Sequence, residues 1–408
     1  MTSNRMFKRV FNGWKNENKS GSVEIFLNQN INSINSKINS RIDSINNIIN
    51  ERIDKQINHE RNNQLPDLHL SPIRLTDTVD TTTISGFIGT TKWNGGVLAP
   101  NGKIYGIPDS DNRIIMIDPK TNKIDTINLS NSLNLENKWN GGVLAPNGKI
   151  YGIPEDIESV LIFDTKTNTV DTTTITGLIG TDKWYGGVLA PNGKIYGIPR
   201  NSESVLIIDP KTNTVDTTSI TGLIGNEKWN GGVLAPNGKI YGIPRNSESV
   251  LIIDPETNTV DTTTITGLIG NQKWFGGVLA PNGKIYGIPR NSESVLIIDP
   301  ETNAVDITSI TGLIGDNKWN GGVLASNGKI YGISRHSESV LIIDPETNTV
   351  DTITITGLIG TQKWIGGVLA PNGKIYGIPR NSESFLIINT SGFPKHGSWM
   401  LQAYYNKI

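Results

Sequence analysis

Hydrophobic and polar residues alternate in short runs along most of the chain, and one pattern of runs is written seven times. Each copy contains KWxGGVLAPNGKIYGIP with small changes, and the copies are 46 or 45 residues apart. A fixed period of this length is typical of repeat architectures, in which each copy forms one supersecondary unit. The tryptophans of the seven copies are Trp93, Trp139, Trp184, Trp229, Trp274, Trp319 and Trp364.

Each repeat predicts four short strands. The run GGVLAP precedes an Asn-Gly pair, the strongest short-range signal for a β-hairpin, and KIYGIP follows it. After the polar run RNSES, the run VLIID is apolar enough to be buried on both faces. After a Pro/Asn turn, TVDTTTI is β-branched and half polar, as suits an outer strand. Four antiparallel strands at this period predict one blade of a β-propeller.

The two ends of the repeat region complement each other. Residues 78–89 read TVDTTTISGFIG and have no SVLIID run before them, whereas the last such run, SFLIIN, has no TVDTTTI run after it. We therefore predict an all-β, seven-bladed propeller of four-stranded blades over residues 77–390. Its N-terminal strand, residues 78–85, should close the last blade by pairing with residues 386–388. Ring closure removes the exposed sheet edges of an open array.

The runs SVLIIDPETNTV and GGVLAPNGKIYGIP resemble the YVTN-type and NHL-like propeller repeats. Those repeats share a V-x-V-I-D-x-x-T-N-x-V strand pair and a G-x-x-x-x-P-x-G-x-x-Y hairpin, and the KWxGG run departs from the YVTN pattern. The resemblance implies the fold and not the function, because such repeats occur in binding proteins, surface proteins and some enzymes. The near-identical tandem copies and the Asn/Ile bias also resemble repeat proteins of large amoebal DNA viruses.

Residues 23–60 carry a helical apolar stripe with spacings of mostly four and three residues. Within it, Leu27, Ile38 and Ile49 lie eleven residues apart, which favours weak or right-handed supercoiling. Isoleucine at both seam positions favours three or four strands. We predict a coiled-coil stalk that forms a homotrimer; packing of this helix on its own propeller is the alternative. The predicted segments are a basic amphipathic segment (1–20), the coiled-coil helix (21–62), a linker (63–76), the propeller (77–390) and a tail (391–408).

The composition limits the kinds of partner and site that the chain can have. The net charge is −1, which gives no general attraction to nucleic acid, and cysteine is absent, which excludes disulfides and thiolate metal sites. We find neither a signal-peptide pattern nor an apolar run long enough to span a bilayer. Known catalytic motifs are missing, and His336, the one histidine within the blades, is interpreted as a surface turn residue. We therefore predict no enzyme activity, cofactor or metal.

Two sets of repeated residues have competing interpretations. The aspartates that end the third strands fit Asx-turn capping better than metal binding. The tryptophans fit wedges between blades better than stacking surfaces for ligands. The aspartates are Asp118, Asp164, Asp209, Asp254, Asp299 and Asp344.

The predicted binding face contains the loop before the first strand and the loop between the second and third strands. The residue after each tryptophan varies between repeats, and Tyr185 and Phe275 offer aromatic surfaces there. Asp109 and Glu155 make the first two blades acidic where five later blades are basic. The alternative is that each arginine pairs with the glutamate of its own RNSES turn. The candidate arginines are Arg200, Arg245, Arg290, Arg335 and Arg380.

These observations favour a non-enzymatic binding or structural protein, displayed on its stalk, with a glycan or a repetitive protein as partner. The lack of a signal-peptide pattern predicts cytoplasmic synthesis, and the resemblance to viral repeat proteins implies a place on a virion. The alternatives are a propeller enzyme of the lyase or lactonase type and an intracellular interaction scaffold.

Overall fold

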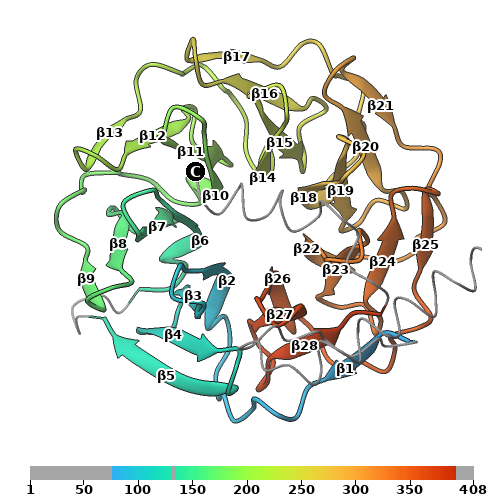
Figure 1. Cartoon of the computed structure of the whole chain (residues 1–408). Coiled ribbons are helices and arrows are strands. Elements are labelled where there is room, and N and C mark those ends of the chain that lie inside the picture. The colour runs from blue at the N-terminus through green and yellow to red at the C-terminus, as the bar shows by residue number, and fades with distance from the viewer. Residues whose placement is uncertain (1–75, 130–134, 392–408) are drawn as a thin grey trace, which may run out of the picture. The chain divides into compact units, whose positions relative to one another are not determined.

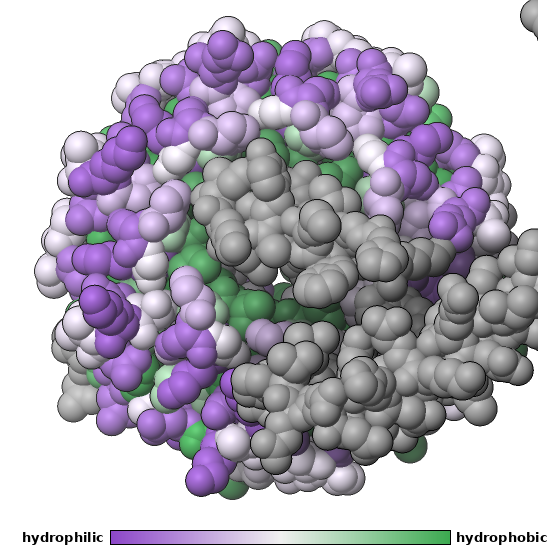
Figure 2. Space-filling view, in the orientation of Figure 1, coloured by the Kyte–Doolittle hydropathy of each residue, from purple (hydrophilic) through white to green (hydrophobic). Residues whose placement is uncertain are grey.

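A computed structural model of the chain describes residues 76–129 and 135–391. They form seven antiparallel sheets of four strands each, arranged as blades around a central axis (Figure 1). The predicted seven-bladed propeller is therefore confirmed. On the side of the ring in view, hydrophilic residues cover most of the rim, and hydrophobic residues lie between and behind them (Figure 2). The predicted stalk, the basic N-terminal segment and the tail from residue 392 lie outside the described residues.

The strands follow the repeat. The innermost strands are β2 (Trp93–Leu98), β6 (Trp139–Leu144), β10 (Trp184–Leu189), β14 (Trp229–Leu234), β18 (Trp274–Leu279), β22 (Trp319–Leu324) and β26 (Trp364–Leu369). The second strands are β3 (Ile104–Pro108), β7 (Lys149–Pro154), β11 (Ile195–Pro199), β15 (Ile240–Pro244), β19 (Ile285–Pro289), β23 (Ile330–Ser334) and β27 (Lys374–Pro379). The third strands are β4 (Arg113–Asp118), β8 (Leu161–Asp164), β12 (Leu206–Asp209), β16 (Leu251–Asp254), β20 (Leu296–Asp299), β24 (Leu341–Asp344) and β28 (Leu386–Asn389). The outer strands are β5 (Lys123–Asn128), β9 (Thr169–Asp171), β13 (Thr214–Asp216), β17 (Thr259–Asp261), β21 (Ala304–Asp306), β25 (Thr349–Asp351) and β1 (Thr78–Asp80).

The N-terminal strand closes the ring as predicted. β1 lies beside β28 in the last blade (Figure 1). The two strands pair antiparallel, with Val79 opposite Ile388. The strand is shorter than the predicted residues 78–85, because the Asp80 carboxylate accepts hydrogen bonds from the backbone N–H groups of Thr82 and Thr83 and turns the chain. Ile84 then lies in the apolar cluster that joins the last blade to the first.

The tryptophans are wedges between blades. Trp139 of the second blade is fully buried among Tyr105, Ile107 and Met116 of the first blade. Its indole N–H donates to the carbonyl of Ser159 at 2.8 Å, so the ring is fixed in place. The other six tryptophans are also buried, at 3 % exposure or less. This confirms the structural interpretation, since no indole face is open to a ligand.

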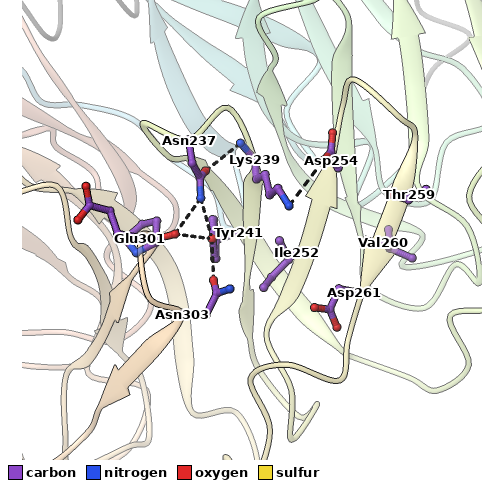
Figure 3. Close-up of a pocket in the computed structure, with 11 residues that line it drawn as sticks. Asn237, Lys239, Tyr241, Ile252, Asp254, Thr259, Val260, Asp261, Glu301 and Asn303 are labelled. Atoms are coloured by element: carbon purple, nitrogen blue, oxygen red, sulfur yellow. Dashed lines mark hydrogen bonds and ion pairs between the residues drawn. The ribbon is translucent and has the colours of Figure 1, made fainter.

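A polar latch joins neighbouring blades on the side of the Asn-Gly turns. Asn237 donates to the hydroxyl of Tyr241 and to the carbonyl of Pro300 in the next blade, at 3.1 and 2.9 Å (Figure 3). Tyr241 donates to Asn303 at 2.9 Å. The latch borders a pocket of about 340 Å³. Because equivalent bonds recur at other blade boundaries, we interpret this pocket as part of the blade-to-blade packing.

The same latch crosses the point of closure. Tyr376 of the last blade donates to Asn122 of the first at 2.9 Å. Tyr331 of the sixth blade donates to Asp77, which precedes β1 and takes the place of the usual asparagine, at 3.1 Å. The predicted Asx turns are also confirmed, since the backbone N–H two residues beyond each repeated aspartate donates to its carboxylate at 2.9 or 3.0 Å.

Candidate site on the arginine face

The loops before the first strands and the RNSES turns do share one face, which we call the arginine face. A bulge between Trp184 and Gly187 takes Tyr185 out of register in β10, while Trp184 pairs with Pro199, the last residue of β11. Arg200 follows directly, and its guanidinium carbon lies 4.2 Å from the centre of the Tyr185 ring. The same local geometry places Arg290 over Phe275, at 5.9 Å.

These side chains converge on the axis. Glycines with positive φ follow the variable residues, and a Cβ built on Gly231 would lie 3.3 Å from the Cα of Gly276 in the next blade. The strands therefore approach one another so closely that only glycine fits. Tyr185 and Phe275, from blades three and five, lie with ring centres 6.4 Å apart. The structure thus brings the two predicted aromatic residues together.

The residue after each tryptophan is elsewhere small or buried. Asn230 is fully buried, and both polar atoms of its amide lack a hydrogen-bond partner in the described part of the chain. Asn320 is 1 % exposed and its Oδ1 is likewise unpartnered within those residues. The variable residues thus bring buried amides and two aromatic rings close together.

The candidate arginines are less exposed than residues of a surface turn usually are. Arg200, Arg245 and Arg290 are only 5–7 % exposed, and Arg335 and Arg380 are partly buried. The alternative, pairing within each turn, is wrong. Arg200 pairs with Asp182, with Glu227 and, at 3.8 Å, with Glu155, so its partners come from neighbouring loops.

Carboxylates neutralise the arginines on one side of the ring. Glu227 also binds Arg245 at 2.9 Å, and Asp109 lies 3.7 Å from Arg380. Glu155 accepts hydrogen bonds from the Tyr185 hydroxyl at 2.5 Å and from Asn140 at 3.0 Å. Burial, reinforced by the nearby Asp109, raises the pKa of Glu155 to about 7. The acidic residues of blades one and two therefore lie inside the site instead of forming an exposed acidic patch.

The residues that sequence reasoning missed precede the repeated lysine. Asp182, Glu227 and Asn317 occupy this position and have left-handed φ values of 48°, 49° and 51°. Each interacts with arginine side chains of the ring. Their signal was available, because this residue varies between repeats while the Lys-Trp pair beside it does not.

The repeated lysines are structural. The Nζ of Lys228 donates to the carbonyls of Arg200, Ser202 and Gly225 at 2.9, 3.0 and 2.7 Å. Burial lowers its pKa to about 8. The buried ammonium group thus links adjacent loops through hydrogen bonds to their backbone carbonyls.

His336 is partly buried, which corrects the interpretation of it as a simple surface residue. Its Nε2 is a buried atom that finds no hydrogen-bond partner in the described ranges. Burial and the positive charges of Arg335, Lys363 and Arg290 lower its pKa. Within residues 76–129 and 135–391, no group of three or more His, Asp or Glu side chains could hold a metal ion. The same residues contain no helix that could cross a bilayer.

Similarity to known proteins is strongest at the level of fold. A family described as a domain of unknown function (DUF5074) matches residues 101–278. No curated protein matches the chain. A streptogramin B lyase structure has 12 % identity and a TM-score of 0.62, and the match covers 78 % of this chain and 99 % of that one.

Two other solved structures show the same fold. Virginiamycin B lyase from Staphylococcus aureus, as a catalytically inactive variant with quinupristin, has 10 % identity and a TM-score of 0.62 over 77 % of this chain and 99 % of that chain. The extracellular domain of a putative hybrid two-component system from B. thetaiotaomicron has 12 % identity and a TM-score of 0.58, over 78 % of this chain and 44 % of that chain. At these identities the matches establish a propeller similar to both lyases and extracellular domains.

Proposed function

We propose that this chain is a non-enzymatic binding protein that engages a protein partner through the arginine face. The observation that carries the proposal is a set of isoleucines at the tips of the loops between blades, here called the isoleucine crown. Each is 80–84 % exposed, which is far from the usual environment of a large aliphatic side chain. They are Ile88, Ile179, Ile224, Ile269, Ile314 and Ile359.

The loops that carry the crown are anchored. Beside Ile224, Leu223 is buried and its backbone N–H donates to the carbonyl of Glu203 at 3.0 Å. The Lys228 ammonium binds the carbonyl of Gly225 on the other side. Each isoleucine is therefore displayed by a fixed backbone. One exposed isoleucine alone would need no explanation, but the residue recurs at the same loop tip in six repeats and gives a regular set of apolar contacts for a partner.

The charge beside the crown indicates the kind of partner. Each crown loop bonds to the backbone of an exposed glutamate in the preceding blade. The glutamates are Glu158, Glu203, Glu248, Glu293, Glu338 and Glu383. A matching partner offers apolar side chains edged by lysine or arginine at repeated spacing, as a protein lattice does. Several weak contacts then add up through multivalency, and a trimeric stalk of residues 23–60 on a virion would increase that number.

A glycan partner is less well supported by this geometry. Tyr185 and Phe275 lie edge to face, and Arg200 and Arg290 are buried beside them. An extended sugar chain lying on the face would therefore meet the crown and the glutamates before the aromatic rings. This favours the repetitive protein among the partners predicted from the sequence.

The test compares the parent with an Ile224→Ser, Ile269→Ser, Ile314→Ser variant. Because these side chains are exposed, the melting temperature should change little, whereas capture of the partner by the immobilised full-length chain should fall at least tenfold through lost avidity. Equal capture by the two proteins would refute the proposal. Binding of the parent to zwitterionic lipid vesicles, lost in the variant, would identify a membrane surface instead.

The alternative is a propeller enzyme of the lyase or lactonase type, or an intracellular scaffold. The similar lyase structures support the enzyme through the fold alone. Incubation of the full-length chain with quinupristin, followed by chromatography, should leave the compound unchanged; consumption that depends on Glu155 or Tyr185 would favour the enzyme.

A further inference from the structure

Two arginines of the ring meet on one neutral amide. The Nε of Arg290 donates to Oδ1 of Asn317 at 2.9 Å, and Arg335 donates to the same oxygen at 3.2 Å. Arg335 donates a second bond to the side-chain oxygen of Gln362 at 3.3 Å. Two guanidinium groups thus lie side by side with only amide oxygens as acceptors.

The equivalent place two blades earlier holds a carboxylate. Glu227 also precedes the repeated lysine, has nearly the same φ as Asn317, and forms ion pairs with both Arg200 and Arg245. Blade four therefore supplies its own counter-ion, and blade six does not. Among the described residues, neither Arg290 nor Arg335 lies within ion-pair distance of a carboxylate.

The unpaired charges are withdrawn from solvent. Arg290 is 7 % exposed, and the Nε of Arg335 is buried with no acceptor among residues 76–129 and 135–391. Burial, together with repulsion from Arg335 and Arg245, lowers the pKa of Arg290 to about 9. Burial, together with repulsion from Arg380 and Arg245, lowers the pKa of Arg335 to about 10. A buried cation without a counter-ion is costly, and a bound anion would offset that cost.

We infer that Arg290 and Arg335 together bind a compact oxyanion, namely a phosphate, sulfate or carboxylate group, at the place where both donate to Asn317. Guanidinium forks match the planar or tetrahedral oxygens of such groups. Phe275 lies beside Arg290 and supplies an apolar wall for a group attached to the anion.

The nearby carboxylates have other partners and do not neutralise Arg290 or Arg335. Glu227 and Asp182 are engaged by Arg200 and Arg245, and Asp109 is nearest to Arg380. Glu155 is held by Tyr185 and Asn140. The anion site therefore lies on the side of blades five and six. It is independent of the isoleucine crown, which lies on the exposed loop tips.

Asn317→Glu tests the inference by placing in blade six the residue that blade four already has. The matched control is Asn271→Glu, which adds the same charge at an exposed loop tip one residue from the equivalent position in blade five. Arg335→Gln provides a second, independent loss of the site. Circular dichroism confirms that each variant is folded.

Isothermal titration of the full-length chain with inorganic phosphate, sulfate, acetate and benzoate measures binding at constant ionic strength. We expect saturable binding of at least one of these at one site per chain. Asn317→Glu and Arg335→Gln should weaken it at least tenfold, and Asn271→Glu less than threefold. Tighter binding of phosphate or sulfate would indicate a tetrahedral ligand, and tighter binding of benzoate an aromatic carboxylate.

The inference is overturned if none of the four anions binds to the parent, or if Asn317→Glu binds as tightly as Asn271→Glu. The triple crown variant should keep the full anion affinity. Loss of partner capture with retained anion binding, or the reverse, therefore shows which of the two proposals fails.

Discussion

Replacing Ile84 by alanine tests whether the N-terminal strand closes the ring in solution. Ile84 is 2 % exposed and packs with Trp93 of the first blade and Phe385 of the last. Ile265 occupies the same place in an internal repeat, between β17 and β18, and is 4 % exposed. If the ring is closed, the two isoleucines are buried equally and Ile84→Ala should be as destabilising as Ile265→Ala.

The expected loss follows from burial. Truncating a buried isoleucine to alanine costs about 2–5 kcal/mol, from the lost transfer free energy and the cavity left behind. For a domain of this size that corresponds to a fall in melting temperature of roughly 5 °C. Differential scanning calorimetry of the parent and both variants measures it. An Ile84→Ala variant that melts with the parent while Ile265→Ala melts earlier would refute closure.

Truncation extends the same test. A chain that begins at residue 77 keeps Asp77, which accepts from Tyr331 and from the backbone N–H of Ser391, and should retain a stable propeller. A chain that begins at residue 90 loses β1 and Ile84 and exposes the edge of β28. It should melt much earlier and aggregate through that edge.

Three further predictions concern pH, one blade boundary and assembly. The pKa of Glu155 is raised to about 7 from an ordinary value near 4.5, so between these values the folded state binds more protons than the unfolded state, and the free energy of unfolding should fall as pH rises from about 4.5 to 7. Glu155→Gln should remove that dependence and add up to roughly 3 kcal/mol to the free energy of unfolding at pH 8. Urea titrations at several pH values measure both effects. The side chain of Asn291 accepts a hydrogen bond from the backbone N–H of Asn317, and His336 stands at the equivalent position for Gln362. His336→Asn should therefore stabilise the propeller by about 1 kcal/mol, and Asn291→His should destabilise it by a similar amount, as calorimetry would show. Light scattering should find the full-length chain trimeric and residues 65–408 monomeric, and a monomeric full-length chain would contradict the predicted stalk.

The fold was predictable because each local sequence signal occurs in several repeats. The hairpin turns, the buried third strand and the capping aspartates appear in nearly every copy, so one ambiguous copy does not change the prediction. Closure followed from the complementary ends of the repeat region. The length of β1 was overestimated, because the threonines after Asp80 favour a strand by propensity but bond to the Asp80 side chain instead.

The site was predictable only in part. Placing Tyr185, Phe275 and the arginines on one face required only the order of strands in a blade. The partners of Arg200 could not be read in the same way, since Glu203 is near in sequence while Asp182 and Glu227 are 18 and 27 residues away. The end of β11 directs the arginine towards the axis and leaves Glu203 exposed in its turn. Such a choice depends on the approach of neighbouring blades, which no single repeat specifies.

The positions that differ between repeats explain how a nearly symmetric ring acquires one asymmetric site. Tryptophan, lysine and glycine occur at the same places in all seven units, and each contacts a neighbouring blade or loop, so the ring constrains them all alike. The residue before the lysine varies between repeats, and where it is Asp182, Glu227 or Asn317 it contacts arginines of the ring. A single change there alters the site without disturbing the packing between blades. Glu227 in blade four and Asn317 in blade six show the result, because the same backbone holds a paired charge in one blade and leaves two arginines open to an anion in the other.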